Sequence, residues 1–130
     1  MSKRTHTPGR TADVTTRRER GQVAIEYLGF IPLLLLVGLL AIQAGLAAYA
    51  ANQAGTGARA GARMASMSTG DCDGQAAKDA MSGWTANRAE VYGPSSVDEV
   101  TCTVSVDVPD IIPGVHIWGP AERSSTMPRT

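Results

Sequence analysis

The sequence predicts an α+β protein: a long N-terminal transmembrane helix that continues into an exported helix, followed by a small α+β domain. The first observation is an apolar block, residues 21–51, in which no charged residue follows Glu26 before Arg59. About 20 apolar helical residues cross the ~30 Å hydrocarbon core of a bilayer, so this block is long enough. The second is a helical pattern over residues 75–88, and the third is a period-two alternation over residues 100–108.

Composition divides the 130 residues into three parts. Residues 1–21 are expected to form a cytoplasmic basic leader, disordered over residues 1–16 because this stretch has no apolar periodicity. Residues 22–67 are expected to form the transmembrane helix and its extension of small residues. Residues 68–130 are expected to form an exported domain with one helix and a two- to three-stranded antiparallel sheet, large enough for one small core but not for a roomy catalytic cleft.

Charge is distributed unevenly, although the formal net charge is zero. Residues 1–21 contain six basic side chains against two acidic ones, namely Lys3, Arg4, Arg10, Arg17, Arg18 and Arg20 against Asp13 and Glu19. A basic flank predicts a single-pass protein of the cell membrane with a cytoplasmic N-terminus and an extracytoplasmic C-terminal domain. The basic segment has no interleaved aromatic residue and no folded module around it, so no nucleic-acid partner is expected.

Polar and small residues within the long helix bear on what it packs against. Gln43 either hydrogen-bonds to a neighbouring helix or has no partner. Beyond it, small residues recur at four-residue spacing, which lets another element approach closely. The residues expected to serve helix packing are Ala54, Gly57, Ala58, Gly61 and Ala62. They fit an alanine-rich helix emerging into water equally well as a helix that packs on copies of itself or on related subunits.

The C-terminal part contains one clear strand and weaker signals. Residues 75–88 predict a helix that Trp84 anchors in a core. Residues 115–125 predict a poorer strand, interrupted by Pro120, that pairs antiparallel with the clear one, and residues 126–130 are expected to fray. The clear strand has one apolar face, formed by Val100, Cys102, Val104, Val106 and Val108.

The cysteines and histidines indicate a disulfide rather than a metal site. Cys72 and Cys102 both follow the apolar block, and an even count in an exported domain favours one disulfide over two free buried thiols. Such a loop closure stabilises by about 3 kcal/mol in the chain-entropy model. His6 and His116 lie on opposite sides of the predicted membrane and no CxxC motif exists, so no metal or cofactor is expected.

Catalysis is not indicated. Ser124, His116 and Asp110 are close in sequence, but nothing marks an oriented base or an oxyanion site, and no phosphate-binding glycine loop is present. A non-enzymatic protein is therefore expected, and a small membrane-anchored enzyme is the weakest hypothesis.

Glu26 is the residue that calls for an explanation, because a carboxylate near the apolar zone of a bilayer is costly. A position at the interface, in the first helical turn, accounts for it in a lone anchor. Alternatively, cleavage after Gly21 would give Gln22 a free amine and make Glu26 the fifth residue of the mature chain. Its carboxylate would then pair with the terminal amine of a neighbouring subunit and fix the axial register.

The residues around Glu26 resemble a known processing site. Gly21-Gln22-Val23-Ala24-Ile25-Glu26-Tyr27 is similar to the site at which a prepilin peptidase cuts type IV prepilin-like proteins after the glycine. Together with Phe30-Ile31-Pro32, the leucine run behind it and Ala58-Arg59-Ala60-Gly61-Ala62-Arg63, it resembles the TadE-like family of pseudopilins from tight-adherence (Tad/Flp) pilus systems. The resemblance covers residues 17–65 well and the C-terminal half only loosely.

The resemblance implies a membrane-inserted minor pilin or pseudopilin, cut between Gly21 and Gln22, that helps to assemble a surface pilus or a related secretion apparatus. Glu26 and Tyr27 match the family's processing and assembly motif. The implied partners are the lipid bilayer, other pilin or pseudopilin subunits, the pilus assembly platform and prepilin peptidase. The alternative is a small secreted binding domain released by signal peptidase after Ala50, because Ala48-Tyr49-Ala50 is similar to its cleavage site.

Overall fold

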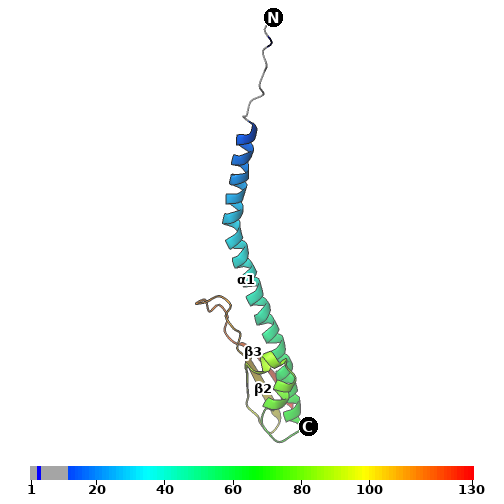
Figure 1. Cartoon of the computed structure of the whole chain (residues 1–130). Helices are drawn as coiled ribbons and strands as arrows, with labels where there is room; N and C mark the ends of the chain where they lie inside the picture. The colour runs from blue at the N-terminus through cyan, green and yellow to red at the C-terminus, as the bar shows by residue number, and fades with distance from the viewer. Residues whose placement is uncertain (1–2, 4–11) are drawn as a thin grey trace. The chain divides into compact units, whose positions relative to one another are not determined.

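A computed structural model describes Lys3 and residues 12–130, with the side chains of Lys3 and of residues 20–130. The elements are α1 (Ala12–Ser66), α2 (Gly74–Asp79), α3 (Gly83–Ala86), β1 (Ala89–Tyr92), β2 (Glu99–Val106) and β3 (Ala121–Pro128) (Figure 1). The predicted fold class is confirmed, because a long apolar helix precedes short helices and a three-stranded antiparallel sheet. The chain divides into two compact units, Met1–Gly38 and Leu39–Thr130.

In the first unit, α1 begins earlier than predicted. The helix starts at Ala12, so the expectation of a disordered leader is wrong for residues 12–16; residues 1–2 and 4–11 of that leader lie outside the described residues. No glycine or proline occurs between Ala12 and Arg20, so this stretch lacks the two residues that disfavour a helix most. Pro32 lies inside α1, and the helix continues beyond it.

In the second unit, β2 is the central strand of the sheet. Its order is β1-β2-β3 and both pairings are antiparallel, with Val106 of β2 opposite Ala89 on one side and Ala121 on the other. The predicted alternation is confirmed, because Val100, Cys102, Val104 and Val106 are fully buried. β-branched side chains at every second position suit a strand with one covered face.

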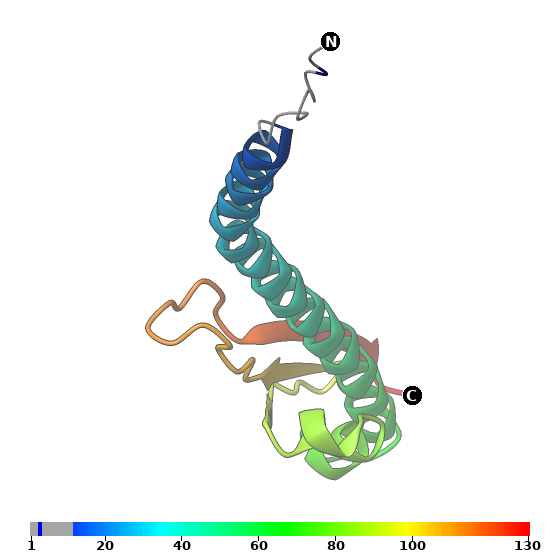
Figure 2. The same cartoon turned by 45° about the horizontal axis from the view of Figure 1, so that its top comes forward.

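The core of this unit lies between the sheet and the C-terminal part of α1 (Figure 2). A stripe of alanines on α1 is completely buried, namely Ala50, Ala54, Ala58, Ala62 and Ala65. An alanine projects only one methyl group, so the helix backbone comes close to its neighbours, and the valines of β2 together with Met81 fill the remaining space.

The predicted helix over residues 75–88 is instead two short helices, α2 and α3. Ser82 between them is extended, at φ −62° and ψ 147°, and its amide donates to Oε1 of Gln53 on α1 at 2.9 Å. Serine followed by glycine is a weak helix former but a good helix start. The break between α2 and α3 therefore follows from the local sequence, and the hydrogen bond from Ser82 to Gln53 on α1 stabilises it.

The prediction that Trp84 anchors the core is wrong. Trp84 is 39% exposed, with its ring 6.4 Å from that of Tyr49 and 5.3 Å from the guanidinium carbon of Arg88. Thr85, its neighbour, is fully buried instead, and its hydroxyl donates to the carbonyl of Ser82 at 2.9 Å. Ala77 and Met81 are buried in the core beneath α1, and Trp84 is not part of it.

The edges of the sheet also differ from the prediction. β1 is an additional strand whose four residues are too few for a clear alternation signal. β3 begins at Ala121, directly after Pro120, and not near residue 115. It continues to Pro128, so fraying from residue 126 is wrong; Thr126 pairs with Thr101, and their hydroxyl oxygens lie 2.8 Å apart.

We expect Gly61→Ala to lower the free energy of unfolding of the Leu39–Thr130 unit by about 1–3 kcal/mol. A Cβ at Gly61 would lie 2.9 Å from the backbone oxygen of Asp73 and 3.2 Å from Sγ of Cys102. Gly55→Ala is the control, because a Cβ there meets its nearest atoms at 3.9 Å, and alanine should stabilise the helix by about 0.5–1 kcal/mol. Denaturant unfolding followed by tryptophan fluorescence measures both; equal effects would contradict this packing.

Candidate membrane span and subunit-contact site

The large apolar side chains of residues 23–42 are exposed along α1. Among the described residues, Arg20–Ser66 is the one helix long and apolar enough to cross a membrane. The apolar side chains include Phe30, Leu34, Leu35, Val37 and Ile42, each more than half exposed. So large an apolar surface is unfavourable in water. By length and composition this segment is a candidate membrane span.

Glu26 lies on one face of this helix among apolar side chains. It lines a shallow pocket of about 400 Å³ with Val23, Tyr27, Phe30, Ile31 and Leu34. These positions follow three- and four-residue spacing, so they share a face. Among the described side chains none forms an ion pair with Glu26. This face therefore presents one carboxylate, surrounded by apolar side chains, to any partner that contacts it.

Gly21 and Gln22, the residues of the predicted processing site, are both exposed and helical. They lie inside α1, with helix on either side of them. An enzyme that cuts between them must therefore bind this stretch from outside the helix or unwind it locally.

The small residues predicted to pack face the chain's own domain. Ala54, Ala58 and Ala62 are fully buried against the sheet. A Cβ at Gly57 would lie 2.9 Å from Sδ of Met81 and 3.0 Å from the carbonyl oxygen of Ala77. The sequence left two alternatives open, a helix that emerges into water and a helix that packs on other subunits, and neither predicts this partner. The chain's own domain covers the row, so these methyl groups offer no surface to a second subunit.

The predicted disulfide is confirmed. Cys72 and Cys102 are bonded, with their Cα atoms 5.3 Å apart. The bond joins the segment that follows α1 to the middle of β2 and lies beside Ala62 and Ala65. It stabilises a core of small side chains, and a closed loop of this size contributes about 3 kcal/mol in the chain-entropy model.

Gln43 has two hydrogen bonds inside the Leu39–Thr130 unit. Its Nε2 donates to the carbonyl oxygen of Pro109 at 3.1 Å, and its Oε1 accepts from the amide of Ile111 at 3.0 Å. The side chain is only 3% exposed. Its partner is therefore the segment that follows β2, not a neighbouring helix, and this contact was not visible in the sequence.

The position of Gln43 limits where a membrane span can end. Irregular backbone such as residues 109–111 is not stable when exposed to lipid in the hydrocarbon region. A span on α1 therefore ends before Gln43. Residues 23–42 provide about 30 Å of helix at 1.5 Å per residue, which matches the thickness of the hydrocarbon core.

Ala50, where signal peptidase would cut under the alternative hypothesis, is fully buried in α1. It packs in the same core as Ala54, Val104 and Val106. Cleavage after Ala50 would remove this methyl group, and Gln43 with it, from the unit.

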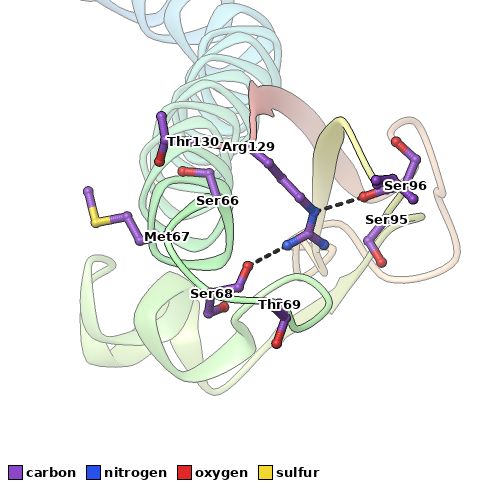
Figure 3. Close-up of a pocket in the computed structure, with 9 residues that line it drawn as sticks. Ser66, Met67, Ser68, Thr69, Ser95, Ser96, Arg129 and Thr130 are labelled. Carbon is purple, nitrogen blue, oxygen red and sulfur yellow. Dashed lines mark hydrogen bonds between the residues drawn. The ribbon is translucent and has the colours of Figure 1, made fainter.

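Arg129 fastens the C-terminal end of the chain to the end of α1 (Figure 3). Its guanidinium donates to the carbonyl oxygens of Ser68 at 2.5 Å and Gly70 at 2.8 Å through its two terminal nitrogens, and to that of Ser96 at 2.8 Å through Nε. An open pocket of about 670 Å³ lies here, lined mainly by serine and threonine. Because the guanidinium binds backbone carbonyls, and those of Ser68 and Gly70 follow the C-terminus of α1, we interpret its role as structural.

The residues considered for catalysis do not form one site. Nδ1 of His116 contacts the carboxylate of Asp110, but Ser124 lies on β3, where its hydroxyl pairs with that of Thr103 at 2.8 Å. Among the described residues, no group of three His, Cys, Asp or Glu side chains is placed to hold a metal ion. Partial desolvation, followed by the carboxylates of Glu122 and Glu90, raises the pKa of Tyr92 above its ordinary value.

These features define a small disulfide-bonded α+β domain built onto the end of a candidate transmembrane helix. Residues 21–63 match the family model described as TadE-like protein, which confirms the resemblance inferred from the sequence. The match runs from Gly21 through Glu26 and the small-residue row to Arg63, and residues 64–130 lie outside it. Comparison with curated proteins gave no match, and comparison with solved structures gave none either.

We expect Gln43→Leu to destabilise the Leu39–Thr130 unit by about 1–3 kcal/mol, because the carbonyl of Pro109 and the amide of Ile111 would lose a buried partner. Asn52→Ala is the matched control, since Asn52 is exposed on the same helix. Amide hydrogen exchange of Asp110, Ile111 and Ile112 in lipid nanodiscs measures the local effect. Unchanged protection in Gln43→Leu would show that this side chain does not hold the segment.

Proposed function

We propose that the chain is a pseudopilin of a Tad/Flp-type pilus or a related secretion apparatus, and that it acts by assembly and not by catalysis. A TadE-like match suggests a minor pilin-like protein associated with a Tad pilus. One observation carries the proposal: the match begins at Gly21, two residues before the exposed apolar part of α1 with its single carboxylate.

In this proposal, residues 23–42 cross the cell membrane with the N-terminus in the cytoplasm and the Leu39–Thr130 unit largely outside. The basic residues 1–21 favour this orientation, because lysine and arginine are retained on the cytoplasmic side. The bond between Cys72 and Cys102 supports it, since disulfides persist in oxidising compartments outside the cytoplasm.

Glu26 acts, in this proposal, after prepilin peptidase has cut between Gly21 and Gln22. The cut leaves a positively charged amine on Gln22 and places Glu26 one helical turn further on. When the apolar faces of neighbouring subunits meet, the carboxylate of one pairs with the amine of the next. In a low-dielectric bundle an unpaired charge is costly, so this pair selects one axial register. Tyr27 lines the same pocket as Glu26, so it would contact the same neighbouring subunit.

The alternative of a secreted binding domain released after Ala50 is less consistent with the packing. Leu46, Ala47 and Ala50 belong to the core that Val104 and Val106 complete. A chain that began at Ala51 would lack these contacts and the hydrogen bonds of Gln43. A helix that completes the core of the domain is retained more readily than it is removed.

We expect the mature chain to begin at Gln22 in cells that contain prepilin peptidase. N-terminal sequencing or intact mass of the membrane-extracted protein measures this directly, and cells that lack the peptidase are the control, in which the leader should remain. A chain that begins near Met1 in both strains would count against processing, and a soluble form that begins at Ala51 would support the alternative.

Glu26→Gln should reduce pilus assembly about tenfold or more, because a hydrogen bond to a charged group contributes about 1.5–3 kcal/mol. The substitution keeps the size of the side chain and removes its charge. Glu90→Gln is the matched control, because Glu90 is an exposed residue of β1. Pilus yield is measured in cells in which the variant is the only copy, with equal amounts in the membrane. Yields that match the control would refute a role of the carboxylate in assembly.

A further inference from the structure

The segment that connects β2 to β3 is an apolar stretch on the surface of the Leu39–Thr130 unit. No aspartate, glutamate, lysine or arginine occurs between Asp110 and Glu122. Val115, Ile117 and Trp118 are 42%, 47% and 49% exposed, and Ile111 and Ile112 are half-buried. Such a group of apolar side chains on one exposed loop is unusual for a surface that faces only water.

The loop has a defined turn at its tip. The amide of Val115 donates to the carbonyl of Ile112 at 3.2 Å, with Pro113 and Gly114 between them. Gly114 has φ +79°, which suits the third position of a type II turn. The apolar residues therefore flank a preformed turn, and the loop extends away from the sheet (Figure 2).

The loop is attached to α1 where the uninterrupted apolar run of that helix ends. Gln43 forms hydrogen bonds to Pro109 and Ile111, near the start of the loop. The apolar residues Leu39, Leu40 and Ile42 precede Gln43 on the same helix. If residues 23–42 occupy the hydrocarbon core, the loop begins at the surface of the bilayer. The loop is thus held to α1 directly after the last large apolar residue of that run, Ile42.

We propose that residues 111–118 insert their apolar side chains into the interfacial layer of the lipid bilayer, beside the point where α1 leaves it. Tryptophan is enriched at this depth, because its ring is apolar and its N–H bonds to headgroups or water. His116, 84% exposed and in contact with Asp110, is tolerated in the polar interface but would be costly deeper in the hydrocarbon. The helix and the loop then attach the unit to the membrane at two points.

The depth of Trp118 tests this proposal in the full-length protein reconstituted into phosphatidylcholine–phosphatidylglycerol vesicles. Trp84→Phe leaves Trp118 as the sole tryptophan, and Trp118→Phe leaves Trp84, the matched internal control. The quencher is phosphatidylcholine brominated in the upper part of its acyl chains, and only protein that floats with the vesicles is measured. Trp118 should lose most of its fluorescence and emit at a shorter wavelength, whereas Trp84 should be quenched little.

Quenching of Trp118 no greater than that of Trp84 would overturn the proposal. Blue-shifted emission without quenching by brominated lipid would overturn it as well, because the loop would then be covered by protein, such as a second copy of the chain. If Trp84→Phe fails to form the disulfide or the native circular dichroism spectrum, the difference between wild type and Trp118→Phe reports the same quantity. The result is independent of pilus assembly, since the vesicles contain no other subunit.

Discussion

The side-chain amide of Gln43 is the contact on which the arrangement of the second unit depends. It bonds to the backbone of Pro109 and Ile111, which lie far from it in the sequence, and it is almost completely buried. An unpaired amide in an apolar environment costs several kcal/mol, so the two hydrogen bonds of Gln43 are retained once they have formed. The role of α1 changes at this residue. Before it the helix exposes large apolar side chains, and after it the helix presents small residues to a sheet.

The same helix is therefore both a candidate span and part of the core of the domain. Ala50, Ala54 and Ala58 bury little area each, so close approach to β2, the disulfide and the contacts of Arg129 supply what a larger core would provide. No flexible linker separates Gln43 from these alanines. A displacement of this part of α1 would therefore carry the domain with it.

Features that depend on local pattern were predictable from the sequence. The apolar block, the alternation of β2 and the pairing of Cys72 with Cys102 are visible as composition, period and count. Partners that depend on long-range contact were not. The spacing of Ala54, Ala58 and Ala62 indicates close packing but not the partner, and the structure places the chain's own sheet there.

Trp84 was wrongly assigned to the core, because its position on a predicted helical face does not reveal which residues fill the core beneath α1. For the candidate site, sequence identified Glu26 and Gly21 by motif, while the role of Gln43 required the fold.

If α1 crosses a bilayer, its lipid-facing part ends at Gln43, because this side chain holds residues 109–111 beside the helix. The most direct test is collisional accessibility of spin labels in lipid bilayers, measured with oxygen and with a water-soluble nickel chelate. Labels are introduced one at a time as Leu35→Cys, Leu39→Cys, Asn52→Cys and Arg59→Cys, with the native disulfide intact. The first two should collide mainly with oxygen and the last two mainly with the chelate. A label at Asn52 that behaves like one at Leu35, or a label at Leu35 open to the chelate, would contradict the account.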